Sequence, residues 1–238
     1  CISAGIDISH ILKVEDHASS TYISVLDENG DMFVALSDMS VLQEMTVDFI
    51  HSKSSIIKGS RLITCDPALH PDVMEEILNL YSDTIPVFVD PVSCAYAETI
   101  VDFIGKFHTA KPNILETEIL SGMKIKSKKD LYKAAEKILD KGLKRIFISL
   151  GADGCLYMDR EGKHIERKLA PVEHMVNASG AGDAFMAAVI YSYINAFTLD
   201  KTIDYGLAAG IVAISHEKTI NPNMSVSLIE NILKERKI

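Results

Sequence analysis

The chain has 238 residues, of which 47% are hydrophobic, and its 24 Lys and Arg against 33 Asp and Glu give a formal net charge of −9. This apolar fraction excludes an intrinsically disordered chain, and the acidic balance argues against a protein that binds duplex nucleic acid. No apolar run reaches the roughly 20 residues of a membrane span, so we expect neither nucleic acid nor a membrane among the partners.

The four cysteines lie far apart and form no CxxC pair, which favours reduced thiols in a cytoplasmic protein. The chain opens at Cys1 without an initiator methionine, and we expect it to begin inside a longer natural protein.

The first forty residues predict a β-hairpin. Two β-rich runs, 21–26 and 32–36, flank Asn29-Gly30, which is a strong signal for a tight turn. The segment 18–40 is therefore either an edge hairpin or a flap that projects over a site.

From residue 61 onward, short apolar runs alternate with helical patterns. The runs 61–66, 85–90 and 145–150 read as buried strands, and 71–81 and 127–141 read as amphipathic helices, with Pro71 in a first turn and Ser127 as an N-cap. The last third reads as helices over 181–195, 199–215 and 225–237. This order predicts an α/β fold with a mostly parallel sheet, in a single domain over 1–238 with 18–40 as an appendage.

A run of glycines and small residues, 177–185, leads directly into the helix predicted from 181. Gly180 and Gly182 permit close backbone approach, and the unpaired N–H groups of a helix start form a ready anion site. Asp183 lies just inside that first turn. It is either a helix cap or a general base that faces a substrate hydroxyl beside the anion site.

The stretch Gly180-Ala181-Gly182-Asp183 resembles the second signature of the ribokinase-like (PfkB) carbohydrate kinases. Other elements of that family occur in the same order: Val89-Asp90-Pro91, Lys111-Pro112-Asn113 followed by Glu116, and Ser149 to Gly154. The resemblance implies a three-layer α/β/α fold, a small-molecule nucleoside or sugar acceptor, and ATP and Mg²⁺ as cofactors. It also implies that the hairpin over 18–40 is a lid and a possible route to a homodimer.

The resemblance assigns a role to each matching residue. Asp183 would take the proton from the acceptor hydroxyl, and the backbone of Gly180, Ala181 and Gly182 would stabilise the transferring phosphoryl group. The residues assigned to the nucleotide are Asn113, Ser149, Gly151 and Gly154, with Glu116 orienting Mg²⁺ through water. Helix capping by Asn113 and turn formation by the two glycines remain open as purely structural roles.

Within the family, the segments 20–27, 30–39, 90–93 and 216–223 most resemble pseudouridine kinases. The implied acceptor is then the 5′-hydroxyl of pseudouridine. Thr21, Asp38 and Ser93 would contact it, although turn and loop chemistry explains these three residues equally well.

Two features depart from the family pattern. Asn177 and Ala178 replace the leading Asp-Thr of the signature, which often helps to hold a monovalent cation in this family. The resemblance therefore does not imply activation by K⁺. The Gly-Gly-x-x-x-Asn element that grips sugar hydroxyls is also missing. Two alternatives follow: a PfkB kinase for another acceptor such as fructose, ribose or adenosine, or a non-catalytic protein that binds nucleotides or nucleosides.

Overall fold

The computed structural model describes residues 1–26, 32–168 and 180–236. Its main sheet has six strands in the order β3-β4-β5-β6-β7-β8, which is also their order along the chain. The strands are β3 (Ile63–Cys65), β4 (Val87–Val89), β5 (Thr109–Ala110), β6 (Arg145–Ser149), β7 (Cys155–Asp159) and β8 (His164–Arg167). Strands β3 to β6 are parallel, and β7 and β8 continue the sheet as antiparallel strands. The predicted α/β class with a mostly parallel sheet is confirmed.

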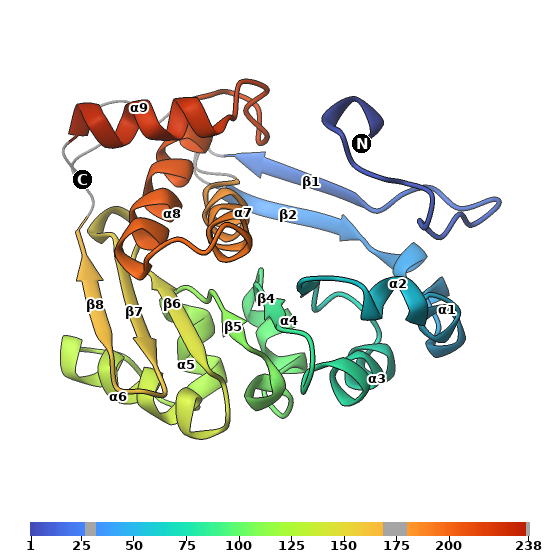
Figure 1. Cartoon of the computed structure of the whole chain (residues 1–238), viewed down its shortest axis with the longest axis horizontal. Helices are drawn as coiled ribbons and strands as arrows, with labels where there is room; N and C mark the ends of the chain where they lie inside the picture. The colour runs from blue at the N-terminus through green and yellow to red at the C-terminus, as the bar shows by residue number, and fades with distance from the viewer. Residues whose placement is uncertain (27–31, 169–179, 237–238) are drawn as a thin grey trace.

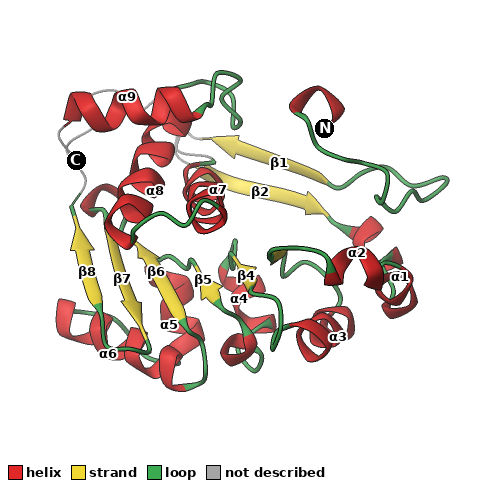
Figure 2. Ribbon diagram, in the orientation of Figure 1, coloured by secondary structure: helices red, strands yellow, loops and turns green. Residues whose placement is uncertain are grey.

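Helices cover both faces of this sheet and make it the middle of three layers (Figures 1 and 2). One face packs α3 (Pro71–Tyr81), α4 (Cys94–Thr99), α5 (Ile114–Ser121) and α6 (Lys128–Asp140) into the larger hydrophobic core. The other face packs against α7 (Ala181–Ile194) and α8 (Leu199–Ile214), and α9 (Val226–Arg236) lies against α8. Short helices α1 (Val47–Ser52) and α2 (Ser54–Lys58) precede β3.

Local capping explains why the helix boundaries were predictable. Pro71 begins α3, and the Ser127 hydroxyl accepts a hydrogen bond from the Asp130 N–H at 3.2 Å at the start of α6. Helices α7, α8 and α9 also lie where the sequence predicts helices, within one residue at each end. Within the described ranges, no helix combines the length and apolar character that a membrane crossing requires.

The predicted hairpin is present as a separate two-stranded sheet of β1 (Thr21–Leu26) and β2 (Met32–Asp38). Its strands are antiparallel, and the Asn29-Gly30 turn lies outside the described residues. Ile23 pairs with Leu36 and Val25 with Val34, so these four side chains share one face. Tyr22 pairs with Ser37 on the opposite face. We call residues 21–26 and 32–38 the lid.

Candidate active site

A cavity of about 710 Å³ lies between the lid and the carboxyl ends of the parallel strands. Ligands of open α/β sheets commonly bind at this edge, because the loops that follow the parallel strands meet there. Seven predicted site residues line the cavity: Ser93, Asn113, Glu116, Ser149, Gly180, Gly182 and Asp183. Further lining residues include Tyr22 and Ser37 from the lid, Met39 directly after it, and Asp90, Lys111 and Thr219 from the main domain.

The N-terminus of α7 forms one wall of the cavity. Gly180 is the N-cap residue, and among the described residues no side chain caps the first turn. The free N–H groups of that turn carry about half a positive charge, which is favourable for a phosphoryl group. Asp183 lies exposed in the same turn, so its carboxylate is accessible to an acceptor hydroxyl in the cavity.

Gly180 is required by its conformation and by a close neighbour. Its φ is +83°, and a Cβ there would lie 2.3 Å from the carbonyl oxygen of Thr219. Thr219 belongs to the segment that follows α8, so the glycine lets this segment approach the start of α7.

We expect Gly180→Ala to destabilise the fold by about 2–4 kcal/mol, since left-handed strain and a backbone clash act together. Thermal unfolding measures this cost. Gly151→Ala is the matched control, because Gly151 also has a positive φ, +61°, but nothing lies within 4 Å of its Cβ position. Equal losses in the two variants would contradict the close approach at Thr219.

A buried ion pair lies beneath this helix start. The Lys111 ammonium contacts a carboxylate oxygen of Asp90 at 3.0 Å, and the Lys111 side chain is only 5% exposed. The same ammonium would lie 3.3 Å from a Cβ at Gly182, so it is close to the α7 backbone. Burial raises the pKa of Asp90, and the charge of Lys111 acts in the opposite direction. The pair therefore holds the Lys111 ammonium next to the first turn of α7.

The loop after β4 is strained where it borders the cavity. Val92 has φ +64°, a left-handed conformation that is rare for a β-branched residue, and Val92 itself lines the cavity. The next residue, Ser93, is the N-cap of α4, because its hydroxyl accepts a hydrogen bond from the Tyr96 N–H at 3.2 Å. Strain of this kind persists where the surrounding structure enforces it and is frequent at functional sites.

Asn113 and Glu116 form a capping box at the start of α5. The Asn113 side-chain oxygen accepts a hydrogen bond from the Glu116 N–H, and the Glu116 carboxylate accepts one from the Asn113 N–H, both at 2.9 Å. The structural role of Asn113 is thus present, and both residues also line the cavity. Asn113 forms an isolated parallel β-bridge with Ser149, which brings the loop after β5 next to the end of β6.

The acidic groups suit a magnesium ion held through water. Burial raises the pKa of Glu116, and one of its carboxylate oxygens is used in the capping box. No set of three close carboxylate, thiol or imidazole groups occurs among the described residues. Mg²⁺ retains several waters and binds through one or two carboxylates plus substrate phosphates, so these residues fit such an ion.

The remaining predicted residues lie outside the cavity lining. Thr21 and Asp38 face each other at the base of the lid, where the Asp38 carboxylate accepts a hydrogen bond from the Ser40 N–H at 3.0 Å. Gly151 and Gly154 bound a short 3₁₀ turn after β6, and Ala181 is the first residue of α7. Asn177 and Ala178, the departure from the family signature, lie outside the described residues.

Sequence reasoning gave no role to the Asp90–Lys111 pair or to Tyr22 and Ser37, and it placed the segment 215–223, which contains Thr219, near the adenine by resemblance. Asp90 follows β4 and Lys111 follows β5, which are adjacent parallel strands. Recognising that these two residues meet at one sheet edge would have identified the pair.

Comparison with known proteins places these motifs in one family. The model for the pfkB family carbohydrate kinases matches residues 1–225. Pseudouridine kinase of Escherichia coli is 32% identical over 233 residues, which cover 96% of this chain and 74% of that protein.

Solved structures agree with this assignment. A crystal structure from Clostridium perfringens, provisionally described as a sugar kinase, has a TM-score of 0.85 and 34% identity; the match covers 99% of this chain and 73% of that one. Ribokinase of Arabidopsis thaliana, solved with ribose and ATP, has the same fold with a TM-score of 0.76 at 18% identity, covering 90% of this chain and 69% of that one. The chain belongs to the pfkB family of carbohydrate kinases, phosphotransferases whose acceptor is an alcohol group.

Proposed function

We propose that the cavity binds ATP with Mg²⁺ and transfers the γ-phosphoryl group to the 5′-hydroxyl of a nucleoside, with pseudouridine as the acceptor. The observation that carries this proposal is that the N-terminus of α7, Asp183 and the lid meet at one cavity. The similarity to pseudouridine kinase over nearly the whole chain supports the choice of acceptor.

The residues divide the reaction between them. Asp183 accepts the proton of the 5′-hydroxyl as that oxygen bonds to the γ-phosphorus, and the bond from the γ-phosphorus to the β,γ-bridging oxygen breaks to release ADP. The backbone N–H groups at Gly180 to Gly182 and the Lys111 ammonium stabilise the charge on the phosphoryl oxygens. Glu116 would hold Mg²⁺ through water, and Asn113 and Ser149 would border the nucleotide phosphates. When bound, Mg²⁺ supplies charge neutralisation of the phosphates.

We assign different roles to two residue pairs of the lid. Tyr22 and Ser37 face the cavity and close over the acceptor, together with Ser93 on the opposite wall. Thr21 and Asp38, next along the two strands, hold the base of the lid.

The acceptor is tested by ADP formation with pseudouridine, uridine, adenosine, ribose and fructose in the presence of ATP and Mg²⁺. We expect kcat/KM for pseudouridine to exceed that for every other acceptor by at least about tenfold. A preference for another acceptor would retain the family and refute the pseudouridine assignment.

The outer face of the lid is a candidate contact with a second copy of the chain. Ile23, Val25, Val34 and Leu36 together form an apolar surface, each between 43% and 64% exposed. A contiguous apolar patch of this kind is rare on a monomer and marks an interaction surface. We propose a homodimer through this surface.

Leu36→Glu is expected to convert the dimer to a monomer, because it places a charge in an apolar interface. Size-exclusion chromatography with light scattering measures the mass. Leu80→Glu, on an exposed part of α3, is the control and should remain dimeric. A monomeric wild type would contradict the proposed homodimer.

A further inference from the structure

The loop after β4 forms an unusual turn at the edge of the candidate active site. The Ser93 N–H donates a hydrogen bond to the Pro91 carbonyl oxygen at 2.6 Å, across a single residue, and that residue, Val92, has φ +64°. A hydrogen bond that spans one residue with a positive φ is the mark of the rare, strained form of γ-turn. A β-branched side chain makes this conformation costlier still.

Neighbouring contacts hold the strained turn in place. The Val92 N–H donates to a carboxylate oxygen of Asp90 at 3.3 Å, and the other carboxylate oxygen pairs with the buried Lys111 ammonium at 3.0 Å. On the far side of the turn, Ser93 caps α4. Strain that the surroundings enforce is frequent at functional positions. Glycine would adopt this turn without strain, so the valine side chain is retained at a cost to the backbone.

Val92 and a nearby tyrosine are accessible to a bound molecule. Val92 is 55% exposed and lines the cavity. Tyr96, in the first turn of α4, lines the same cavity and is half-buried. Within the described part of the chain, the Tyr96 ring contacts no other aromatic ring and its hydroxyl forms no hydrogen bond. Both side chains therefore have surface free for a ligand in the cavity.

The turn lies at the acceptor end of the cavity. It follows β4, whereas Asn113 follows β5 and Ser149 ends β6, and these three strands are neighbours in that order. Burial is the main cause that raises the pKa of Asp90, and the charge of the nearby Asp183 adds to the rise. The carboxylate that holds Val92 is thus close to the proposed general base and lies on the side of the cavity away from the end of β6.

The apolar part of the lining suits a nucleobase better than a sugar alone. Tyr22 of the lid and Met39, directly after it, line the cavity together with Val92 and Tyr96. A free sugar carries hydroxyl groups around its ring and gains little from such surfaces. A nucleobase presents a flat face that stacks on a tyrosine ring and packs against an aliphatic group.

We propose that Val92 and Tyr96 contact the nucleobase of the acceptor and make this site prefer a nucleoside over a free sugar. The Tyr96 ring stacks on the nucleobase, and the Val92 isopropyl group, held by the strained turn, packs against it. This assignment rests on the proposed function, because it takes the acceptor to be a nucleoside.

The test measures binding without turnover, by titration calorimetry on the full chain. Pseudouridine is the probe, and ribose is the matched ligand that lacks the nucleobase. Wild type should bind pseudouridine at least about tenfold more tightly than ribose. Val92→Gly and Tyr96→Leu should each lower this ratio by at least about threefold, since each removes surface that faces the nucleobase. Tyr96→Phe keeps the ring and should retain the wild-type ratio.

Thermal unfolding separates contact with the ligand from a structural role of Val92. Because glycine adopts the turn without strain, Val92→Gly without ligand should unfold at the same temperature as wild type or a higher one, although it binds pseudouridine more weakly. A purely structural role would give the opposite pattern, a lower unfolding temperature with an unchanged ratio of affinities.

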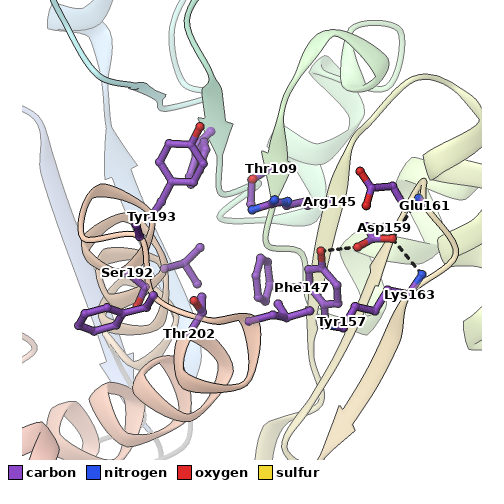
Figure 3. Close-up of a pocket in the computed structure, with 15 residues that line it drawn as sticks. Thr109, Arg145, Phe147, Tyr157, Asp159, Glu161, Lys163, Ser192, Tyr193 and Thr202 are labelled. Carbon is purple, nitrogen blue, oxygen red and sulfur yellow. Dashed lines mark hydrogen bonds between the residues drawn. The ribbon is translucent and has the colours of Figure 1, made fainter.

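The control for Val92→Gly comes from the other end of α7. A second cavity, of about 460 Å³, lies at the last turns of this helix around Ser192 and Tyr193 (Figure 3). Ala196 lines that cavity, is exposed, and also has a positive φ, +52°. Ala196→Gly therefore relieves left-handed strain outside the candidate active site and should keep the wild-type ratio of affinities.

The proposal is overturned if wild type binds ribose as tightly as pseudouridine, or binds neither. It is also overturned if Val92→Gly and Tyr96→Leu keep the wild-type ratio. Failure of the kinase proposal looks different: pseudouridine binding that depends on both residues, without ADP formation when ATP and Mg²⁺ are added, would refute the reaction and leave this assignment standing.

Discussion

Asp183→Asn is expected to lower kcat by a factor of about 10²–10⁴ while leaving the fold and the binding of ATP intact. Asparagine has nearly the same shape as aspartate, but it cannot accept the proton of the acceptor hydroxyl. The side chain is exposed in the first turn of α7, so no buried contact is lost. Steady-state ADP formation and a separate ATP-binding titration distinguish loss of chemistry from loss of binding.

The control for this variant is Asp72→Asn. Asp72 is also an exposed acid in a first turn, that of α3, and it lies outside the cavity lining. Both substitutions remove the interaction of a carboxylate with a helix start, which contributes about 0.3–1 kcal/mol to stability. Only Asp183→Asn should affect turnover. Near-normal turnover in this variant would exclude Asp183 as the general base.

Lys111→Met is expected to destabilise the fold by about 3–5 kcal/mol, because it leaves the buried Asp90 carboxylate without its counter-charge. For a chain of this size that loss corresponds to a fall in Tm of roughly 6–20 °C. The variant should also lose turnover, since the ammonium lies beside the phosphoryl-binding turn. Thermal unfolding and ADP formation measure the two effects.

A double substitution separates the two roles of Lys111. Adding Asp90→Asn to Lys111→Met should restore much of the stability, because the unpaired charge is removed, but it should not restore turnover. Lys124→Met is the control, since the Lys124 side chain is 79% exposed in its pair with Glu118, whereas Lys111 is 5% exposed, and its loss should cost about 1 kcal/mol or less. If Lys111→Met were as mild as Lys124→Met, the buried pair would not have the energetic role assigned to it.

The parts of the fold that were predictable are those with local signals. Pro71 and Ser127 mark helix starts within their own turns, and Asn29-Gly30 marks a hairpin between two β-rich runs. Strands β7 and β8 received no assignment. β7 is a short apolar run buried along nearly its whole length, and its antiparallel pairing with β6 is a tertiary contact that sequence periodicity does not reveal.

The candidate site shows the same division between local and long-range information. The glycine run and Asp183 are contiguous, so their meeting at a helix start follows from sequence alone. Asp90 and Lys111 are 21 residues apart (111 − 90) and meet only because their strands are adjacent. For the lid, the sequence predicted the hairpin but not the residues that line the cavity. The alternation of side chains along a strand predicts two faces of the lid, but it does not say which face lines the cavity. The sequence analysis named Thr21 and Asp38, whereas Tyr22 and Ser37 line the cavity.

The most direct test of the proposed function is ³¹P NMR of a reaction that contains the protein, ATP, Mg²⁺ and pseudouridine. We predict one new phosphomonoester signal, coupled to the 5′ protons of the ribosyl group, that grows in equal amount with ADP and is absent with Asp183→Asn. Binding of both ATP and pseudouridine by wild type without any phosphomonoester would contradict the account and indicate a non-catalytic binding protein.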